Sequence, residues 1–313
     1  MKGLELSEAY FRTHGLPMLE RDFPGLLPHL AAGLLGSGSE CFGYDDDLST
    51  DHDFEPGFCL FLPSEEVVDR RTAFLLERAY AALPAEFMGY RRAPTPPVGG
   101  SRHGVLRLAE FLAERTGRPD GRAVGREWLC LPEQSLAEVT NGRVFYDGRG
   151  ELTDIRRHLS YFPEDVRLKK LAGQLLLMGQ SGLYNYGRSL VRGDTAAAQL
   201  SAIAFADSAT SAIFLLNATY RPYYKWCFRT LMSLPLLGEC AGELEYLISS
   251  GNTEREAEEK SALITRLAAA VVSVARGQGL TDYRGDEMEG HAAAVNRRVG
   301  DADLRTLPLL YGV

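Results

Sequence analysis

The sequence is poor in cysteine and has neither a long apolar run nor an excess of basic residues. Only five of its 313 residues are cysteines, and no two of them form a Cys-x-x-Cys pair. This pattern argues against a disulfide framework or a zinc site and favours a reducing compartment. The N-terminus, MKGLELSEAYFRTHGL, has no apolar signal core, and no stretch reaches about 18 uncharged apolar residues. We therefore expect a cytoplasmic protein without a membrane segment.

The net charge and the apolar content indicate which kind of protein this is. The formal net charge is −8, whereas proteins that bind duplex DNA usually carry a strong basic excess. Apolar residues make up 45% of the chain, which is enough for a substantial packed core. The length corresponds to about two domains. We expect a folded two-domain protein whose main partner is not duplex DNA.

The first half of the chain shows short apolar runs that are typical of buried strands. The run Leu30–Leu35 ends in Gly36-Ser37-Gly38-Ser39, which predicts a strand that turns tightly. A second strand is expected at 57–62, followed by a helix that Ser64 caps. Later strands are expected at Val105–Leu108 and Arg143–Asp147.

The second half has helical periodicity almost throughout, with helices expected at Val166–Val191, Thr195–Ala218, Tyr223–Ser233, Glu239–Ser249, Arg255–Ala275 and Met288–Arg298. Strands therefore cluster early and helices late. This segregation predicts an α+β domain over residues 1–160 and an all-helical bundle over 161–313.

The segment between the first two expected strands is rich in carboxylates. It contains Asp51 and Asp53, which are two residues apart and would share one face at the entrance of a strand. Paired carboxylates suit divalent metals that bridge substrate phosphates. Gly36 and Ser37 would offer backbone N–H groups and a hydroxyl to those phosphates. The alternative is a solvated turn capped by aspartate, and for Asp45-Asp46-Asp47 we expect a solvated loop.

A Gly-Ser turn followed, after about a dozen residues, by Asp-x-Asp entering a strand resembles the polymerase-β-type nucleotidyltransferase superfamily, to which kanamycin and lincosamide nucleotidyltransferases belong. Three longer stretches resemble a bacterial family described as DUF4037 proteins. They read GLLGSGSECFGYDDDLSTDHDFEPGFCLFL, LPEQSLAEVTNGRVFYDGRGELTDIR and RPYYKWCFRTLMSLP. The likeness extends from about Leu30 to Leu236.

The resemblance implies transfer of a nucleoside monophosphate from an NTP to a hydroxyl, with release of pyrophosphate and with two Mg²⁺ (or Mn²⁺) ions. It places metal at Asp51 and Asp53 and the NTP phosphates at Gly36 and Ser37. The acceptor is a small molecule, a protein side chain or an RNA end, and the acidic net charge favours the first two.

The sequence departs from the superfamily at the third carboxylate, which commonly lies on a later strand. Arg107 stands where an acid is expected, and Glu110 and Asp147 are the candidates. The alternative for Glu110 is an acid in the first turn of a helix, and the alternative for Asp147 is an aspartate in a turn. If no third acid exists, the chain is instead an NTP-binding regulatory module that transfers slowly or not at all.

Basic and aromatic residues of the helical half are candidates for contacts to the phosphates or the acceptor: Tyr184, Arg188, Arg192 and Lys225. The plainer interpretation is that the arginines pair with Asp194 or Asp207 and that Tyr223, Tyr224 and Trp226 pack in the core. Arg284 and His291 also fit a short Arg-x6-His pattern that is similar to the one in helical ribonuclease toxins.

Overall fold

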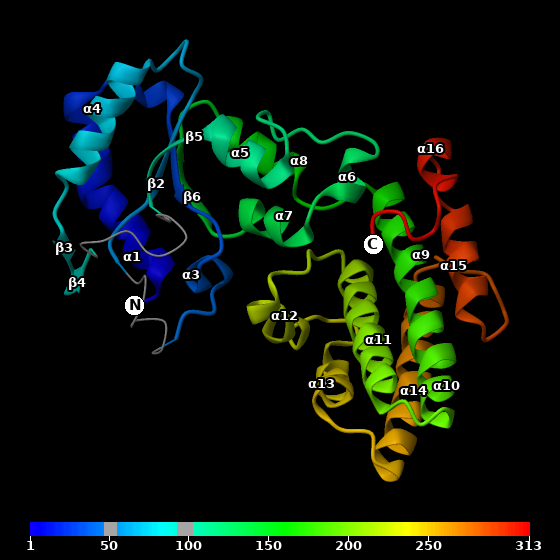
Figure 1. Ribbon diagram of the computed structural model, residues 1–313. Helices are drawn as coiled ribbons and strands as arrows, with labels where there is room; N and C mark the ends of the chain where they lie inside the picture. The colour runs from blue at the N-terminus through cyan, green and yellow to red at the C-terminus, as the bar shows by residue number, and fades with distance from the viewer. Residues whose placement is uncertain (47–54, 93–102) are drawn as a thin grey trace. The chain divides into compact units, whose positions relative to one another are not determined.

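The computed structural model describes residues 1–46, 55–92 and 103–313 (Figure 1). The chain forms two compact units. The first contains residues 1–123 and 131–160, and the second contains residues 124–130 and 161–313. The short stretch 124–130, which falls in the first domain of the sequence-based division, therefore packs with the helical unit.

The first unit is built on a mixed four-stranded sheet with the order β5-β2-β1-β6. Its strands are β1 (Ala31–Leu34), β2 (Cys59–Leu62), β5 (Gly104–Arg107) and β6 (Arg143–Asp147). Strand β1 runs antiparallel to both β2 and β6, whereas β2 and β5 are parallel. With the helical second unit, this sheet confirms the predicted α+β class.

The two faces of β2 pack against different helices. Leu60 and Leu62 belong to the core that also contains Tyr10 and Phe11 of the N-terminal helices. Phe61 points the other way, and its ring lies 5.0 Å from that of Phe111. The alternation follows from the strand period of two, and because both faces are covered all four residues of β2 are buried. Figure 1 shows α1 and α4 on one side of this sheet and α5, α7 and α8 on the other.

The remaining elements of the first unit are α1 (Gly3–Tyr10), η1 (Phe11–Gly15), α2 (Leu16–Asp22), η2 (Leu27–His29), α3 (Ser39–Phe42), α4 (Arg70–Ala81), β3 (Glu86–Phe87), β4 (Tyr90–Arg91), α5 (Leu108–Thr116), α7 (Glu133–Thr140) and α8 (Glu151–His158). The prediction that Ser64 caps the helix after β2 is wrong. Helix α4 begins six residues later, where the Asp69 carboxylate accepts a hydrogen bond of 2.7 Å from the Thr72 N–H.

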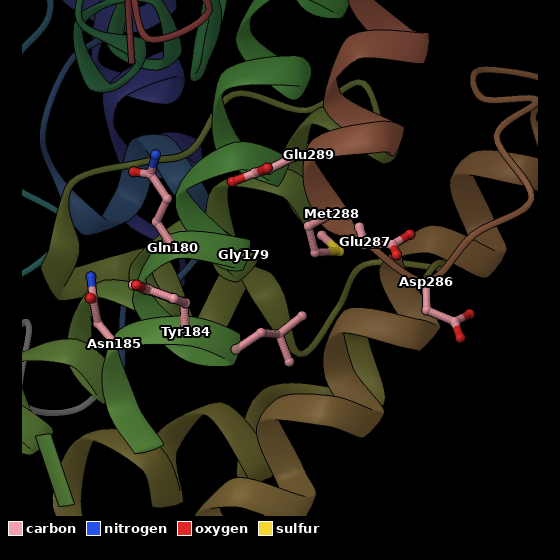
Figure 2. Close-up of a pocket in the computed structure, with 9 residues that line it drawn as sticks. Gly179, Gln180, Tyr184, Asn185, Asp286, Glu287, Met288 and Glu289 are labelled. Atoms are coloured by element: carbon pink, nitrogen blue, oxygen red, sulfur yellow. The ribbon is translucent and has the colours of Figure 1, made fainter. Parts of the chain in front are cut away.

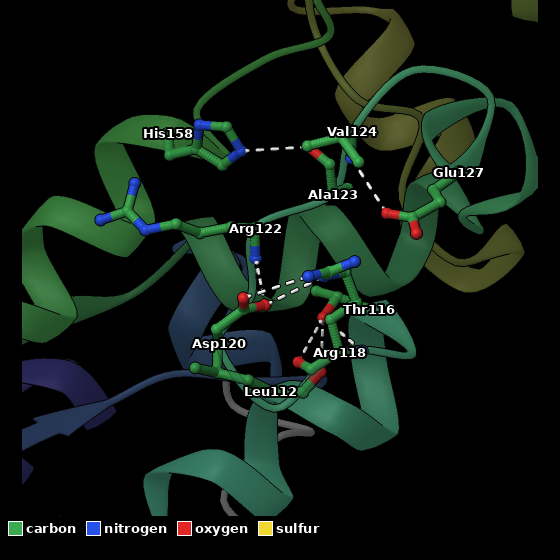
Figure 3. Close-up of polar contacts among 9 residues, drawn as sticks. All are labelled: Leu112, Thr116, Arg118, Asp120, Arg122, Ala123, Val124, Glu127 and His158. Atoms are coloured by element: carbon green, nitrogen blue, oxygen red, sulfur yellow. Dashed lines mark hydrogen bonds and ion pairs between the residues drawn. The ribbon is translucent and has the colours of Figure 1, made fainter.

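The loop after α5 is held by its own polar contacts (Figure 3). The Arg118 guanidinium binds both carboxylate oxygens of Asp120, at 3.1 and 3.2 Å. The backbone N–H of Arg122 donates to the same carboxylate, and these bonds lower the pKa of Asp120 to about 2. The His158 Nε2 lies 3.4 Å from the carbonyl oxygen of Ala123, so α8 reaches the last residues of this loop.

The second unit is all helical and is organised around α11 (Thr195–Leu216). The other elements are α6 (Glu127–Cys130), α9 (Glu164–Met178), the π-helical η4 (Gly179–Tyr186), α10 (Gly187–Val191), α12 (Tyr224–Leu231), η5 (Gly238–Cys240), α13 (Ala241–Ser249), α14 (Glu254–Gly277), α15 (Met288–Arg297) and α16 (Ala302–Arg305). Helix α11 packs against α9, η4, α13 and α14.

Helix α11 is also long and apolar enough to span a membrane by length and composition, the only helix among the described residues to be so. Its most apolar 18-residue window is 67% buried in the folded chain. Core helices pass the same test of length and composition, and the packing of α11 against four neighbouring elements explains its apolar sequence.

Candidate functional site

The predicted phosphate-binding turn directly follows β1. Gly36 is buried and has φ of +129°, a backbone conformation that favours glycine, whereas the next residue, Ser37, is exposed. The tight turn therefore depends on Gly36, and the side chain at position 37 is left accessible.

The side chain of Asn141 holds this turn in place. Its amide oxygen accepts a hydrogen bond from the Gly36 N–H at 3.0 Å, and its amide nitrogen donates to the Gly36 carbonyl oxygen at 2.7 Å. A carboxamide can satisfy both backbone groups because it carries one acceptor and one donor side by side. The Gly36 N–H is thus engaged within the protein, so a phosphate would have to use other donors of the turn.

Asn141 is in turn positioned by a half-buried arginine. Helix α7 ends just before Asn141, and its last carbonyl groups have no partner within the helix. The Arg156 guanidinium of α8 donates to the carbonyl oxygens of Val139 at 3.1 Å and Thr140 at 2.7 Å, and also to that of Asn141. Burial lowers the pKa of Arg156 from its ordinary value. Helix α8, the end of α7 and the turn after β1 are therefore linked by consecutive hydrogen bonds.

Two glycines allow the start of β6 to lie directly against β1 and its turn. Gly142 has φ of +59°, and a Cβ atom there would lie 1.9 Å from the carbonyl oxygen of Leu34. A Cβ on Gly33 would lie 2.6 Å from the carbonyl oxygen of Arg143. The Gly142 N–H donates to the Cys41 carbonyl oxygen at 2.9 Å. This backbone contact leaves no room for a side chain at either glycine.

The strand register places four chain segments at one edge of the sheet. Gly33, near the end of β1, pairs with Cys59 at the start of β2, and Cys59 pairs with Gly104 at the start of β5. Leu34 pairs with Arg143 at the start of β6. The turn at Gly36 therefore leaves the sheet at the edge where β2, β5 and β6 begin.

Asp51 and Asp53 precede β2 in the chain, and both lie outside the described residues. Within residues 1–46, 55–92 and 103–313, no three His, Cys, Asp or Glu side chains are grouped to hold a metal ion. The metal site at Asp51 and Asp53 stays a prediction.

The two candidates for a third carboxylate lie at the opposite edge of the sheet. Asp147 ends β6, where it pairs with Ala31 at the start of β1, and its carboxylate accepts hydrogen bonds from the N–H and hydroxyl of Thr153, both at 2.8 Å. Glu110 is exposed in the first turn of α5, which follows the end of β5. Neither carboxylate lies at the edge that carries Gly36, so we do not retain them as catalytic candidates.

Arg107 also lies at that far edge, where it pairs with Leu62, and its guanidinium donates to the Pro63 carbonyl oxygen at 2.7 Å. It therefore does not occupy the position expected for the third acid next to the turn.

The sequence analysis did not identify a histidine and a carboxylate that lie at the sheet edge carrying Gly36. The Nδ1 atom of His103 lies 3.5 Å from the Glu55 carboxylate, and the His103 side chain is only 9% exposed. Its ring packs over Gly57, where a Cβ atom would lie 2.7 Å from the imidazole. The glycine just before the buried run of β2 was the available signal, because it marks a place where another side chain approaches the backbone.

The acidic residues of the chain between α3 and residue 46 have different environments. Asp45 is buried, so the expectation of a solvated loop is wrong at that position, whereas Asp46 is exposed. The Asp45 carboxylate accepts from the Gly3 N–H at 2.8 Å and lies 3.4 Å from the Lys2 ammonium. It therefore anchors the start of α1. Glu40 is also buried, in the first turn of α3 beside Gly38.

The candidates in the helical unit are all exposed. The Arg188 guanidinium lies 4.7 Å from the centre of the Tyr184 ring and donates to its hydroxyl at 2.8 Å. The Lys225 ammonium lies 4.9 Å from the Trp226 ring. Arg192 caps the C-terminus of α10. The three cations are accessible to an anionic ligand from solvent.

The plainer interpretations of these side chains are partly wrong. Asp207 pairs with Arg221 rather than with Arg188 or Arg192. Asp194 caps α11 through a hydrogen bond of 2.9 Å from the Ala197 N–H. Tyr223 and Tyr224 are 40% and 75% exposed, so they do not pack in the core as expected.

The Arg-x6-His pattern does not form an accessible pair. His291 is buried, with Nδ1 at 2.9 Å from the Thr281 hydroxyl and Nε2 at 3.1 Å from the Gly285 carbonyl oxygen. Arg284 is exposed. A histidine with both nitrogens engaged inside the protein is not placed to act on RNA.

Comparison with known proteins supports one part of the resemblance. The family model of a domain of unknown function, DUF4037, matches residues 128–227. The resemblance to that family is thereby confirmed over these residues, which include Asn141, Arg156 and Lys225. No curated protein and no solved structure matches the chain.

Proposed function

We propose that this chain, which carries a DUF4037 match over residues 128–227, is a nucleotidyltransferase that moves a nucleoside monophosphate from an NTP to a hydroxyl group. The observation that carries the proposal is the arrangement at one sheet edge. The clamped turn after β1 lies there, and β2, whose preceding segment contains Asp51 and Asp53, begins there.

The turn is the proposed cradle for the NTP phosphates. Because Asn141 occupies both backbone groups of Gly36, the remaining donors are the exposed Ser37 hydroxyl and the N–H groups that follow it. The clamp keeps these donors oriented before the substrate arrives. Such preorganisation avoids the cost of ordering the turn during the reaction.

In the proposed reaction, the acceptor hydroxyl oxygen bonds to the α-phosphorus, and the bond from that phosphorus to the bridging oxygen of the β-phosphate breaks. Pyrophosphate leaves, and the hydroxyl proton must pass to a base. His103, held by Glu55 at the same sheet edge, is the group that we propose for this proton. It takes the place of the acids at Glu110 and Asp147, which lie at the far edge.

The donor set proposed for a metal consists of carboxylate oxygens, from Asp51 and Asp53, and such hard ligands fit Mg²⁺ or Mn²⁺. Mg²⁺ held there would neutralise charge on the phosphates. For the acceptor, the net charge of −8 favours a small molecule or a protein side chain over an RNA end.

One observation favours the alternative, an NTP-binding module that does not turn substrate over. The described part of β5, the strand expected to carry the third acid, contains none: it reads Gly104-Val105-Leu106-Arg107. If His103 cannot take the proton, the chain would bind NTP without transferring the nucleotide.

The two possibilities are separated by one experiment. Each α-labelled NTP is incubated with Mg²⁺ and cell extract, using the wild type, the double variant Asp51→Ala/Asp53→Ala, and Glu66→Ala as the matched control. Glu66 is an exposed carboxylate that follows the opposite end of β2. We expect the wild type and the control to transfer label and the double variant to lose transfer.

NTP binding by the wild type without transfer of label would support the regulatory module. Equal transfer by the wild type and the double variant would refute the proposed site.

A further inference from the structure

The helical unit contains a cavity of about 660 Å³ between the η4 segment and the start of α15 (Figure 2). Its volume lies within the range of small-molecule sites. The described residues that line it all belong to the second unit. It is also independent of the function proposed above.

One part of the lining is apolar. Leu183 and Tyr184, from η4, are 44% and 58% exposed, which is high for an apolar and an aromatic side chain. Met288 lies opposite them at the start of α15. A Cβ atom on Gly179 would lie 2.9 Å from the Met288 Cβ, so the glycine lets the two elements meet at the base of the cavity. This surface suits the apolar or aromatic body of a ligand.

The polar part of the lining is acidic. Asp286, Glu287 and Glu289 stand along the α15 side, and the carboxamides of Gln180 and Asn185 stand along the η4 side (Figure 2). Among the described residues that line the cavity there is no lysine or arginine. The carboxylates therefore favour a cation along the α15 side, whereas the exposed Arg188 guanidinium lies 4.7 Å from the Tyr184 ring on the η4 side.

The acidic wall is held in position by hydrogen bonds within the second unit. The Tyr283 hydroxyl donates to the Glu287 carboxylate at 2.6 Å, and this bond lowers the pKa of Glu287. His291, which is buried, binds the Gly285 carbonyl oxygen at 3.1 Å. Arg276 donates to the carbonyl oxygens of Tyr283 and Gly285, at 3.1 and 3.2 Å. The backbone before α15 and the Glu287 side chain are thus held in place before a ligand arrives, which reduces the cost of binding.

We infer that this cavity binds a small organic cation, an amine or guanidine carried on an apolar or aromatic body. The cationic group would lie against Glu289 and Asp286, whose carboxylates face solvent, and the body would contact Leu183, Tyr184 and Met288. Three carboxylates in the lining disfavour a triphosphate there. Tyr184, predicted as a phosphate contact, therefore lines a cavity whose charged lining residues, among those described, are all acidic.

The test uses three probes of similar shape: 2-phenylethylamine as the cation, 2-phenylethanol as the neutral analogue and 3-phenylpropanoate as the anion. Their affinities for the full chain are measured by calorimetry at low salt. We expect the amine to bind about tenfold more tightly than the alcohol and the anion to bind most weakly, as one favourable ion contact predicts.

Variants then locate the site. Glu289→Gln removes one carboxylate with little change of shape, and Glu245→Gln is the matched control on an exposed face of α13. We expect Glu289→Gln, but not the control, to reduce the preference for the amine, and Tyr184→Ala to weaken both the amine and the alcohol. Circular dichroism verifies that each variant is folded. The inference is overturned if the amine binds no better than the alcohol, or if Glu289→Gln and Glu245→Gln behave alike.

Discussion

Replacing Asn141 by alanine removes both hydrogen bonds that hold the Gly36 turn. The lost contacts are the 3.0 Å bond from the Gly36 N–H and the 2.7 Å bond to its carbonyl oxygen. Gly36 is buried, so both backbone groups would lose their partners away from bulk water. A buried polar group without a partner costs about 1–3 kcal/mol, and two such groups give an expected loss of about 2–6 kcal/mol in the free energy of unfolding of the first unit.

The effect is measured by urea denaturation together with hydrogen exchange of peptides that cover residues 33–42. Because the chain has two compact units, the exchange data assign the loss to the correct one. We expect exchange in these peptides to accelerate by about 30-fold or more, as 2 kcal/mol implies, while peptides of α11 remain protected. The matched control is Gln134→Ala, an exposed position on helix α7, which ends just before Asn141. It should leave the free energy of unfolding and the exchange rates unchanged.

Asn141→Asp sharpens this test. An ionised aspartate keeps an acceptor for the Gly36 N–H but places a second acceptor opposite the Gly36 carbonyl oxygen. The variant should therefore be destabilised at neutral pH and recover at acidic pH, where the protonated carboxyl group can donate. If Asn141→Ala unfolds like the wild type and exchange at the turn is unchanged, the clamp does not support the turn and the reasoning is refuted.

Three further predictions concern the same contacts and the wall of the cavity. Arg156→Lys should destabilise the first unit by about 1–3 kcal/mol in urea denaturation, because one ammonium cannot reach three carbonyl groups as the guanidinium does; no change would argue against its role. Gly142→Ala should cost about 2 kcal/mol or more, because its Cβ would meet the backbone of Leu34 and its φ is +59°; a variant as stable as wild type would contradict that close approach. Burial lowers the pKa of His291 below its ordinary 6.5, so the unfolded chain takes up the proton first as the pH falls. The resulting stability of the second unit is fully present above about pH 6.5 and is lost as the pH falls through the lower folded pKa, whereas His291→Gln should flatten this profile; parallel pH profiles would show that His291 does not titrate in this way.

The strands and most helices could be predicted from the sequence because their patterns are local. Arg143–Asp147 is a strand as expected, and the periodic second half forms helices close to the expected bounds. The start of α4 was missed because Ser64 and Asp69 are both plausible caps and periodicity cannot choose between them. Caps depend on a few hydrogen bonds rather than on a repeated pattern.

The candidate site was predictable only in part. Gly36 and Ser37 form the tight turn that the small residues indicated, but the sequence did not show that Asn141, more than a hundred residues later, occupies the Gly36 N–H. The sequence could not show that Glu110 and Asp147 lie at the edge away from Gly36, because strand direction decides which sheet edge the end of a strand reaches. Strand direction and order are properties of the assembled sheet.

The sequence by itself determined the α+β class, the local turn after β1 and the apolar helices of the second half, because each follows from composition and period over a few neighbouring residues. Only the tertiary structure decided which edge of the sheet each polar residue reaches, that His103 meets Glu55, and that Tyr184 lines the same cavity as three carboxylates. Those relations join residues far apart in the chain, and they arise when strand register and helix packing bring the residues together.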